Sequence, residues 1–258
     1  MEDLKNKILL NADYHTHTFY SHGKSTPYEN ILRAKELQMQ AIAITDHGPH
    51  HFIYGVSNKN LIKQRQEIEK LKQEINGIDI YFGVEADIKG LDGKIDIDIF
   101  NKNFFDIILC GFHKPVWASE FSDYFNLFLN SYTKIFLKPS ASIVRKNTKA
   151  YVNTIKNNPI DILTHPNYHL KINCKEVGKC CADYGTFLEL SSRHNDLSEA
   201  DMYDLLATDV KFVLNSDAHR LENIGNCANA LNLVKKFSIP EDRIVNCNGK
   251  KIELRSKR

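Results

Sequence analysis

The 258-residue sequence has no run of eighteen or more apolar residues, which argues against a membrane-spanning helix. Its first ten residues, MEDLKNKILL, contain acidic side chains and no long apolar segment, so we expect no signal peptide. The formal net charge is only +2, which is too small to indicate a polyanionic partner such as nucleic acid. These absences predict a cytoplasmic protein that binds neither membranes nor nucleic acid.

The cysteines lack the spacing of a structural zinc site. The chain has six cysteines, and no two of them form a Cys-x-x-Cys pair, so a zinc ribbon is not expected. Six cysteines in a chain of this length also do not make the dense pattern of a small disulfide-stapled domain. Reduced and mostly buried thiols are therefore the expected state.

Apolar, strand-like runs alternate with amphipathic, helix-like segments along the chain. The composition, 42% hydrophobic and 26% charged, is typical of a folded globular protein. Seven βα repeats without a linker predict one α/β domain over residues 1–258, built on a parallel sheet that is either a barrel or doubly wound. The expected strands cover residues 7–17, 41–47, 78–87, 106–113, 160–166, 186–192 and 211–219, and the expected helices cover 27–38, 60–75, 122–136, 173–185, 198–207 and 221–237.

Metal-binding side chains end six of the seven expected strands. The carboxyl ends of parallel strands converge on one rim of a barrel, where the catalytic residues of such barrels lie. This placement favours a barrel over a doubly wound sheet. The strand-end residues are His15 and His17, Asp46 and His47, Glu85, His113, His165, and Asp217 and His219.

The spacing of these residues has a physical reason. His15 and His17 are two residues apart, so in a strand they share one face and can bind the same ion. Asp217 and His219 repeat this spacing. Imidazole and carboxylate suit zinc, iron or manganese, and Glu85 has two oxygens that could bridge two ions. Each residue alone fits a hydrogen-bonded rim residue or a helix cap, but the ensemble favours a metal centre.

Six motifs spread over residues 13–219 are similar, in order, to those of the PHP (polymerase and histidinol phosphatase) superfamily. They read DYHTHTFYSH, ITDHGP, GVEADIKGLDGKID, CGFHKPV, THPN and NSDAH. The chain most resembles the stand-alone histidinol-phosphatase-like phosphoesterases. The resemblance implies a distorted (β/α)7 TIM-like barrel and three divalent metal ions, with zinc as the first expectation and manganese or iron as alternatives.

The resemblance also implies how the ligands divide among the three ions. Glu85 would bridge the first two ions, and the place of His22 depends on a short segment, FYSH. The implied ligands are His15, His17, Glu85 and Asp217 for the first ion, Glu85, His113 and His165 for the second, and His22, His47 and His219 for the third.

Such a ligand set suits phosphoester hydrolysis without a covalent phosphoenzyme, and the resemblance implies that the substrate is a small phosphate monoester. Paired ions lower the pKa of bound water and clamp the attacking and leaving oxygens. A hydroxide bridging the first two ions would attack phosphorus, and the third ion would bind phosphate oxygens. The residues expected to take part in catalysis are Glu85, Asp217, His219 and Arg193.

Further side chains near the rim could contact the phosphate. Arg193 and His194 follow the sixth expected strand, and an arginine can grip phosphate with two parallel hydrogen bonds. Lys114 and Arg220 are weaker candidates of the same kind. For all four residues, a solvated surface side chain is the alternative.

Three polar residues near the second expected strand have ordinary structural interpretations. Asp46 either orients the imidazole of His47 or caps a turn. His50 and His51 follow in a loop, where we expect them to be exposed and outside the site.

Other classes of protein share parts of this pattern. A PHP-type phosphodiesterase or nuclease could use the same three ions, but the chain lacks the strongly basic composition of nucleic-acid-binding proteins. An amidohydrolase barrel also begins with a His-x-His pair, but that family typically bridges its ions with a carbamylated lysine, whereas Glu85 takes this place here. A non-catalytic metal-binding protein is the third alternative. The sequence leaves open the physiological substrate and whether the chain forms a homo-oligomer.

Overall fold

A single sheet of seven parallel strands forms the centre of the fold. The computed structural model describes residues 8–97, 103–114 and 139–257. The strands follow one another in chain order from β1 to β7, and every neighbouring pair is parallel. Their bounds are β1 Ala12–Asp13, β2 Ala41–Ile44, β3 Asp79–Asp87, β4 Ile107–Gly111, β5 Ile162–Leu163, β6 Phe187–Ser191 and β7 Phe212–Asn215.

The sheet curls into a nearly closed barrel. Just beyond the ends of β1 and β7, Thr16 and Ala218 form a parallel bridge. The N–H of His17 donates to the carbonyl of Ala218 at 2.8 Å, and the N–H of Ala218 donates to the carbonyl of His15 at 3.2 Å. The predicted distorted (β/α)7 TIM-like barrel is therefore confirmed, while the single domain over 1–258 stays a prediction.

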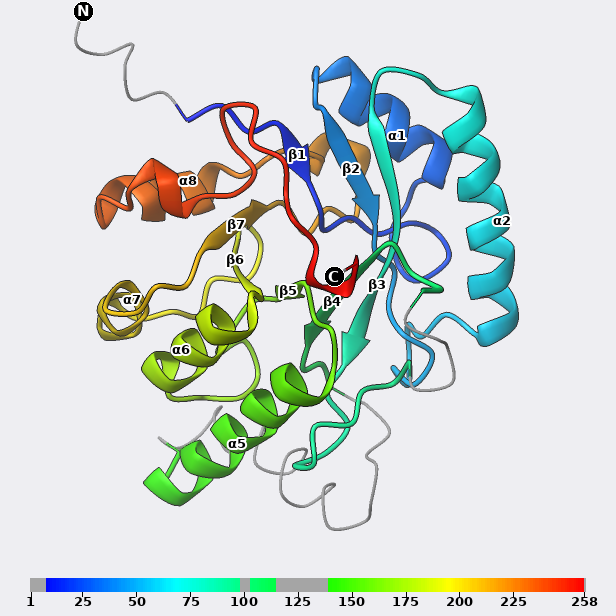
Figure 1. Cartoon of the computed structure of the whole chain (residues 1–258). Coiled ribbons are helices and arrows are strands. Elements are labelled where there is room, and N and C mark those ends of the chain that lie inside the picture. The colour runs from blue at the N-terminus through cyan, green and yellow to red at the C-terminus, as the bar shows by residue number, and fades with distance from the viewer. Residues whose placement is uncertain (1–7, 98–102, 115–138, 258) are drawn as a thin grey trace, which may run out of the picture.

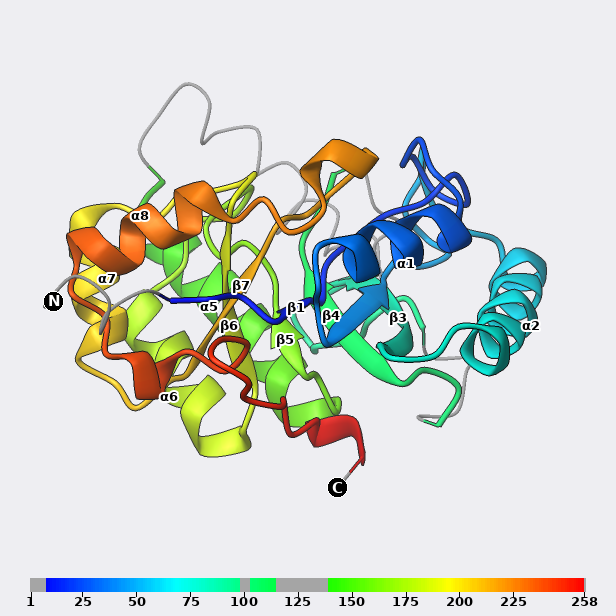
Figure 2. The same cartoon turned by 90° about the horizontal axis from the view of Figure 1, so that it is seen from above.

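Helices cover the outside of the barrel (Figure 1). Seen from above, α1 and α2 lie on one side of the strands and α5 to α8 on the other (Figure 2). Among the described helices, none is both long and apolar enough to cross a membrane. The helix bounds are α1 Pro27–Glu36, α2 Asn58–Glu74, α5 Ala141–Asn157, α6 Cys174–Tyr184, α7 Glu199–Leu206 and α8 Ala228–Lys236.

Local sequence signals set several helix ends. The side chain of Thr26 accepts from the N–H of Glu29 at the start of α1, and the Glu29 carboxylate accepts in return from the N–H of Thr26. Ser198 and Asp201 make the same capping box for α7, as their spacing in the sequence predicts. Gly185 ends α6 in the left-handed conformation, with φ of 71°, which glycine adopts without steric cost.

Helix α5 is an element that the sequence analysis does not identify. Its residues include lysines, asparagines, threonines and valines, several of which have modest helix propensity. Ser140 caps its first turn, and one face buries Ala150, Tyr151 and Ile155 against the rest of the fold. Tertiary packing of this face, rather than local propensity, therefore stabilises the helix.

Two predicted elements differ from the structure, and a third falls on residues that the structure does not describe. The expected strand over 7–17 pairs as a strand only at Ala12–Asp13, with single bridges on either side at Leu10 and Thr16. The expected helix over 221–237 begins only at Ala228, because Gly225 turns the chain with φ of 72°. The expected helix over 122–136 lies outside the described residues.

Alternate residues of the strands face two different apolar layers. Ile42 and Ile44 of β2 belong to the layer between the barrel and its helices, whereas Ala41 and Ala43 face the barrel interior. The interior layer also includes Leu109 of β4. This filled interior supports a layer of buried polar side chains at the carboxyl ends of the strands.

Candidate metal centre

The carboxyl ends of the strands place all nine predicted metal ligands at one mouth of the barrel. Eight of them are buried, and His22, from the loop after β1, is half-buried. Glu85 is within β3, while the others follow the ends of β1, β2, β4, β5 and β7. The structure therefore brings together the set His15, His17, His22, His47, Glu85, His113, His165, Asp217 and His219, although 204 positions separate the first from the last.

Two of these residues reach the centre through an unusual backbone. His165 has φ of 21° and Asp217 has φ of 54°, both in the region that favours glycine. Such conformations cost about 1–3 kcal/mol each and persist where the surrounding structure enforces them. Both residues stand immediately after short strands, so the turn aims their side chains over the barrel mouth.

Glu85 lies between two pairs of imidazoles. Its Oε1 is 2.9 Å from Nε2 of His165 and 3.3 Å from Nε2 of His113. Its Oε2 is 3.3 Å from Nε2 of His15 and 3.5 Å from Nε2 of His17. Each carboxylate oxygen thus faces a different pair of nitrogen donors, which is the arrangement that a bridging ligand requires.

Asp217 completes the first of these groups. Its Oδ1 is 3.4 Å from Nε2 of His17 and 3.7 Å from Nε2 of His15, and the two Nε2 atoms are 3.1 Å apart. The four side chains that the resemblance assigns to one ion, the fourth being Glu85, therefore converge on one point.

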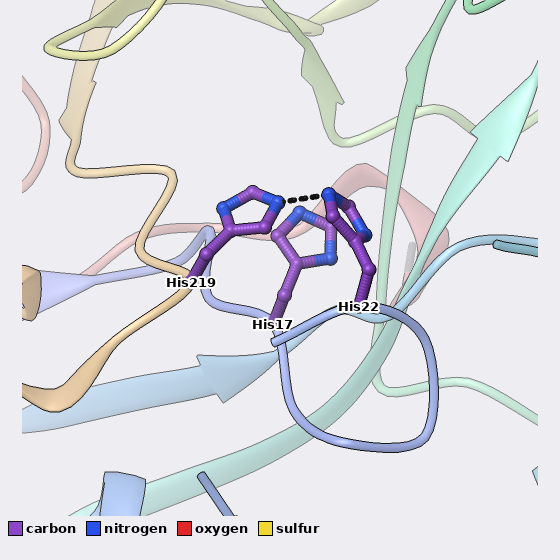
Figure 3. Close-up of side chains that lie close together, drawn as sticks. All are labelled: His17, His22 and His219. Atoms are coloured by element: carbon purple, nitrogen blue, oxygen red, sulfur yellow. Dashed lines mark hydrogen bonds between the residues drawn. The ribbon is translucent and has the colours of Figure 1, made fainter. Parts of the chain in front are cut away.

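The third group differs in composition from the implied one. His17, His22 and His219 gather their ring nitrogens (Figure 3), and the Nε2 atoms of His22 and His219 are in contact. His47 lies next to this group, with its ring stacked on His22 at 5.0 Å, but its Nδ1 faces Oε2 of Glu85 at 3.3 Å. The ring nitrogens of His17 thus lie with those of His22 and His219, and the assignment of His47 to the third ion stays a prediction.

Hydrogen bonds to the far ring nitrogens fix the orientation of three imidazoles. Nδ1 of His15 is 2.8 Å from Oε1 of Glu189, and Nδ1 of His113 is 2.8 Å from Oδ1 of Asp87. An ionised carboxylate can only accept, so each Nδ1 donates its proton outward and each Nε2 faces the centre. Nδ1 of His219 donates in the same way to the backbone carbonyl of Asp217 at 2.9 Å.

Glu189 and Asp87 are functional candidates that the sequence analysis did not identify. The sixth strand was interpreted as lacking a metal-site residue, yet Glu189 lies at its centre and is fully buried. The signal was present, since an acid inside an apolar strand is rarely buried without a partner. Asp87 is two residues after Glu85, so the period of a strand puts it on the same face.

The imidazoles of the third group are held neutral. Burial lowers the pKa of His22 to about 4 and that of His219 to about 3. Burial, together with the nearby His219 and His47, also lowers the pKa of His17 well below its ordinary value. Neutral imidazole is the form that binds metal, so this group is ready to accept a cation at pH 7.

The carboxylates of the centre are buried close together, so a nearby cation would stabilise them. Burial opposes ionisation of Glu85, but His113 and His15 lower its pKa well below the ordinary value. Burial, supported by the charges of Glu85 and Glu189, raises the pKa of Asp217 to about 7. Burial lowers the pKa of His15, but the carboxylates of Glu85 and Glu189 outweigh this and raise it well above normal. Buried carboxylates gathered at one point require a cation to offset them.

The donor set fits divalent metal ions. Ligands at about 2.0–2.1 Å from a tetrahedral zinc ion lie about 3.3 Å from one another, and the Nε2 and oxygen atoms around Glu85 are 2.9–3.5 Å apart. Nδ1 of His22 and Nδ1 of His47 are buried and have no hydrogen-bond partner among the residues that the structure describes. The geometry of these donors therefore supports metal binding.

The candidate phosphate-binding residues surround the mouth. Arg193, His194 and Lys114 line a cavity of about 220 Å³ directly over the cluster, and Arg220 lines an adjoining cavity of about 640 Å³. Nε2 of His194 is 3.6 Å from Oδ2 of Asp217, and its ring lies 3.9 Å from that of Tyr168. All four residues are thus placed within reach of a bound substrate, and their contact with phosphate stays a prediction.

Two expectations about the second loop are corrected. His51 is buried rather than exposed, because its Nδ1 accepts from the N–H of Tyr54 at 3.0 Å and its ring stacks on His47 at 4.7 Å. His50 is half-buried, with its N–H donating to the Asp96 carboxylate at 3.1 Å.

Asp46 turns toward the loop after β1 rather than toward His47. It accepts from the N–H of Thr18 at 2.7 Å and from the side-chain amide of Gln64 at 2.5 Å. Its Oδ1 is also 3.9 Å from Nδ1 of His17. Asp46 therefore fixes the loop that carries His17 and His22.

Known proteins are similar to this chain in sequence or in fold. A "Probable phosphatase" of Shewanella oneidensis is 30% identical over 250 residues, which cover 91% of this chain and 86% of the relative. A "Probable phosphatase" of Caldanaerobacter subterraneus is 29% identical, covering 96% of this chain and 91% of that relative. The crystal structure of histidinol phosphate phosphatase from Lactococcus lactis, complexed with zinc, L-histidinol and phosphate, matches with a TM-score of 0.64 at 18% identity, covering 94% of this chain and 98% of that one.

The family follows from the sequence match rather than from the fold alone. At 18% identity, the Lactococcus lactis structure shows that the two proteins share a fold. Residues 13–203, in contrast, match the model of the PHP domain. That range includes seven of the nine clustered ligands, and the match to the Shewanella oneidensis protein extends over most of the chain. The chain belongs to the PHP domain family.

Proposed function

We propose that this protein is a metal-dependent hydrolase of small phosphate monoesters, histidinol-phosphatase-like in fold and chemistry, with three divalent ions in its site. The observation that carries the proposal is the position of Glu85, whose two oxygens face two separate pairs of imidazoles beneath an open cavity. The names of the relatives support phosphatase activity, because two of them, each about 30% identical, are called probable phosphatases.

The metal ions would be held by the three groups of side chains around Glu85, Asp217 and His219. When bound, divalent ions supply activated water at neutral pH and positive charge for the phosphate oxygens. Zinc is the first expectation, since imidazole and carboxylate suit it and the Lactococcus lactis protein was crystallised with zinc. Manganese and iron remain alternatives.

The side chains of the protein supply orientation and further charge. Glu189 and Asp87 hold the imidazoles of His15 and His113 so that Nε2 faces inward. Arg193 is positioned at the edge of both cavities, where its guanidinium can donate two parallel hydrogen bonds to phosphate oxygens. Direct attack of water on phosphorus needs no covalent intermediate, so no nucleophilic serine or cysteine is required.

Partial burial keeps the His194 imidazole, which lies beside the expected substrate, in its neutral form. Burial lowers the pKa of His194 to about 3, so its ring is neutral at pH 7 and can accept or donate a hydrogen bond. Its partner Asp217 and the adjacent ring of Tyr168 fix its position. We therefore assign His194, like Arg193, to the binding of the phosphate group.

Metal analysis combined with a substrate panel tests the proposal. Purified protein should contain close to three divalent ions per chain, and should hydrolyse phosphomonoesters in a reaction that chelators abolish and added divalent ions restore. A single-stranded oligonucleotide and a phosphodiester serve as the comparison substrates for a nuclease. Metal-loaded protein that cleaves these but no phosphomonoester would overturn the proposal, as would protein that binds no metal.

A further inference from the structure

The larger cavity beside the metal centre is placed to hold the organic part of the substrate. It has a volume of about 640 Å³, within the usual range for small-molecule sites. It shares five lining residues with the smaller cavity over the cluster, namely His22, Tyr54, Arg193, Asp217 and His219. A phosphate bound at the cluster would therefore direct its ester oxygen, and the group attached to it, into this space.

The charged side chains around the larger cavity are mostly positive. Lys24, Arg193 and Arg220 line it, whereas Asp217 is the one carboxylate among the lining residues in the part of the chain that the structure describes. Asp217 faces the imidazoles of the metal centre. Arg220 approaches Glu222 only at 3.9 Å, with both side chains mostly exposed, so its charge is largely available.

The remaining wall is polar rather than apolar. This part of the wall is formed by the segment that runs from the short 3-10 helix after β7 to the first turn of α8. Its side chains at the cavity are those of Asn223, Asn226 and Asn229. The side-chain amide of Asn229 donates to the carbonyl of Ser192 at 2.8 Å, which holds this wall against the end of β6. Amide and hydroxyl groups beside cations suit anionic and hydroxyl oxygens, because these oxygens accept the hydrogen bonds that such groups donate.

We propose that the leaving group of the natural substrate carries a second anionic group, a carboxylate or a phosphate, which binds between Lys24, Arg193 and Arg220. The inference rests on the proposed phosphomonoesterase activity and names its substrate class. Such a site disfavours a cationic leaving group, because an ammonium would be placed among three like charges. A histidinol-like amino alcohol is therefore a poor substrate for this chain.

Phosphomonoesters of similar size and different charge test this directly. Phosphoglycolate carries a carboxylate on its leaving group, phosphoethanolamine carries an ammonium, and glycerol 3-phosphate is neutral there. Each partly exposed cation should change kcat/KM by a factor of about two to five, so phosphoglycolate should exceed phosphoethanolamine by about tenfold or more. Ethylene glycol bisphosphate shows whether a second phosphate is preferred to a carboxylate, and histidinol phosphate should rank with phosphoethanolamine.

Charge-reversal variants assign the effect to the cavity. Arg220→Glu and Lys24→Glu should each lower kcat/KM for phosphoglycolate by about fivefold or more, raise it for phosphoethanolamine, and change it least for glycerol 3-phosphate. Lys35→Glu is the matched control, because this exposed lysine in the last turn of α1 changes the net charge equally at the far end of the helix. The Lys35→Glu variant should leave the ranking of the substrates unchanged, since salt largely screens charges that are more than about 10 Å apart.

The outcomes separate this inference from the proposed function. Hydrolysis of all phosphomonoesters with equal or greater preference for phosphoethanolamine would overturn the inference and leave the phosphatase proposal intact. A ranking that Lys35→Glu changes as much as Arg220→Glu does would also overturn it. Absence of hydrolysis for every phosphomonoester in metal-loaded protein would instead overturn the proposed function itself.

Discussion

Nδ1 of His15 lies 2.8 Å from the carboxylate of Glu189, although the two residues are 174 positions apart. Both side chains are fully buried. The same carboxylate accepts from the backbone N–H of His165 at 2.9 Å and from the amide of Asn215 at 2.9 Å. A single acid in β6 thus positions residues from the ends of β1, β5 and β7 around the metal centre.

The variant Glu189→Gln should weaken metal binding without removing any predicted ligand. A neutral amide no longer stabilises the Nδ1 proton of His15, so the imidazole loses its fixed tautomer and part of its basicity. Changes of this kind typically lower metal affinity by about 10- to 100-fold. Competition titration with a chelator measures the affinity, and the exposed Glu176→Gln is the control. Equal affinity in both variants would show that Glu189 has a purely structural role.

The variant Glu85→Ala should lose metal and activity together. Removing the bridging carboxylate takes one donor from each of two groups, and leaves His113 and His165 without their contact to Oε1. We expect a fall of about 100-fold or more in kcat/KM, because each ion contributes several kcal/mol to stabilising the transition state. Elemental analysis and phosphatase assays on the same preparation measure both. Wild-type metal content and turnover would show that the bridging assignment is wrong.

Removal of metal should lower the thermal stability of the wild-type protein. A ligand present at 100 times its dissociation constant adds about 2.7 kcal/mol to the free energy of unfolding. For a chain of this size, each kcal/mol corresponds to about 2–4 °C in Tm. Chelation should therefore lower the Tm by about 5–10 °C or more, as measured by differential scanning calorimetry. The same chelator should move the Tm of Glu85→Ala much less, and an equal shift would place the stabilising ion elsewhere.

Buried Asp96 should make the folded state less stable as the pH rises. Burial and the charge of Asp87 raise its pKa to about 8, well above the ordinary value of 3.8. The unfolded chain then releases this proton near pH 4 and the folded chain only near pH 8. Between these values the folded state binds more protons, so its stability falls as the pH rises, by up to about 1.4 kcal/mol per pH unit. Above pH 8, this contribution is already lost.

Comparing the wild-type protein with Asp96→Asn measures how much the ionisation of Asp96 contributes to the pH dependence of stability. Urea unfolding between pH 5 and 8 should show a steeper loss of stability in the wild type, whatever the absolute stability of the variant. Contributions from the metal centre are common to both proteins and cancel in the difference of the two slopes. Parallel curves would mean that Asp96 is ionised in the folded protein at neutral pH.

The alternation of elements could be predicted from the sequence, but the extent of several elements could not. Alternating burial in β2, with Ile42 and Ile44 outward and Ala41 and Ala43 inward, follows from the period of a strand. Helix α5 is missing from the expected elements, because its buried face mixes Ala150, Tyr151 and Ile155 with the polar residues Asn147, Thr148 and Thr154. The first strand is shorter than its apolar pattern, because pairing requires a neighbour in register and not only suitable residues.

The sequence by itself determined which residues would meet at the barrel mouth, because strand direction places the side chains that end β1 to β7 on the same rim. Only the tertiary structure decided how they group. His17 gathers with His22 and His219, and Glu189 and Asp87 hold the imidazoles of His15 and His113 in place. The physical reason is that the period of a strand fixes the face on which a side chain lies. Its partners across the rim depend instead on loop paths and the curvature of the sheet, which no local pattern encodes.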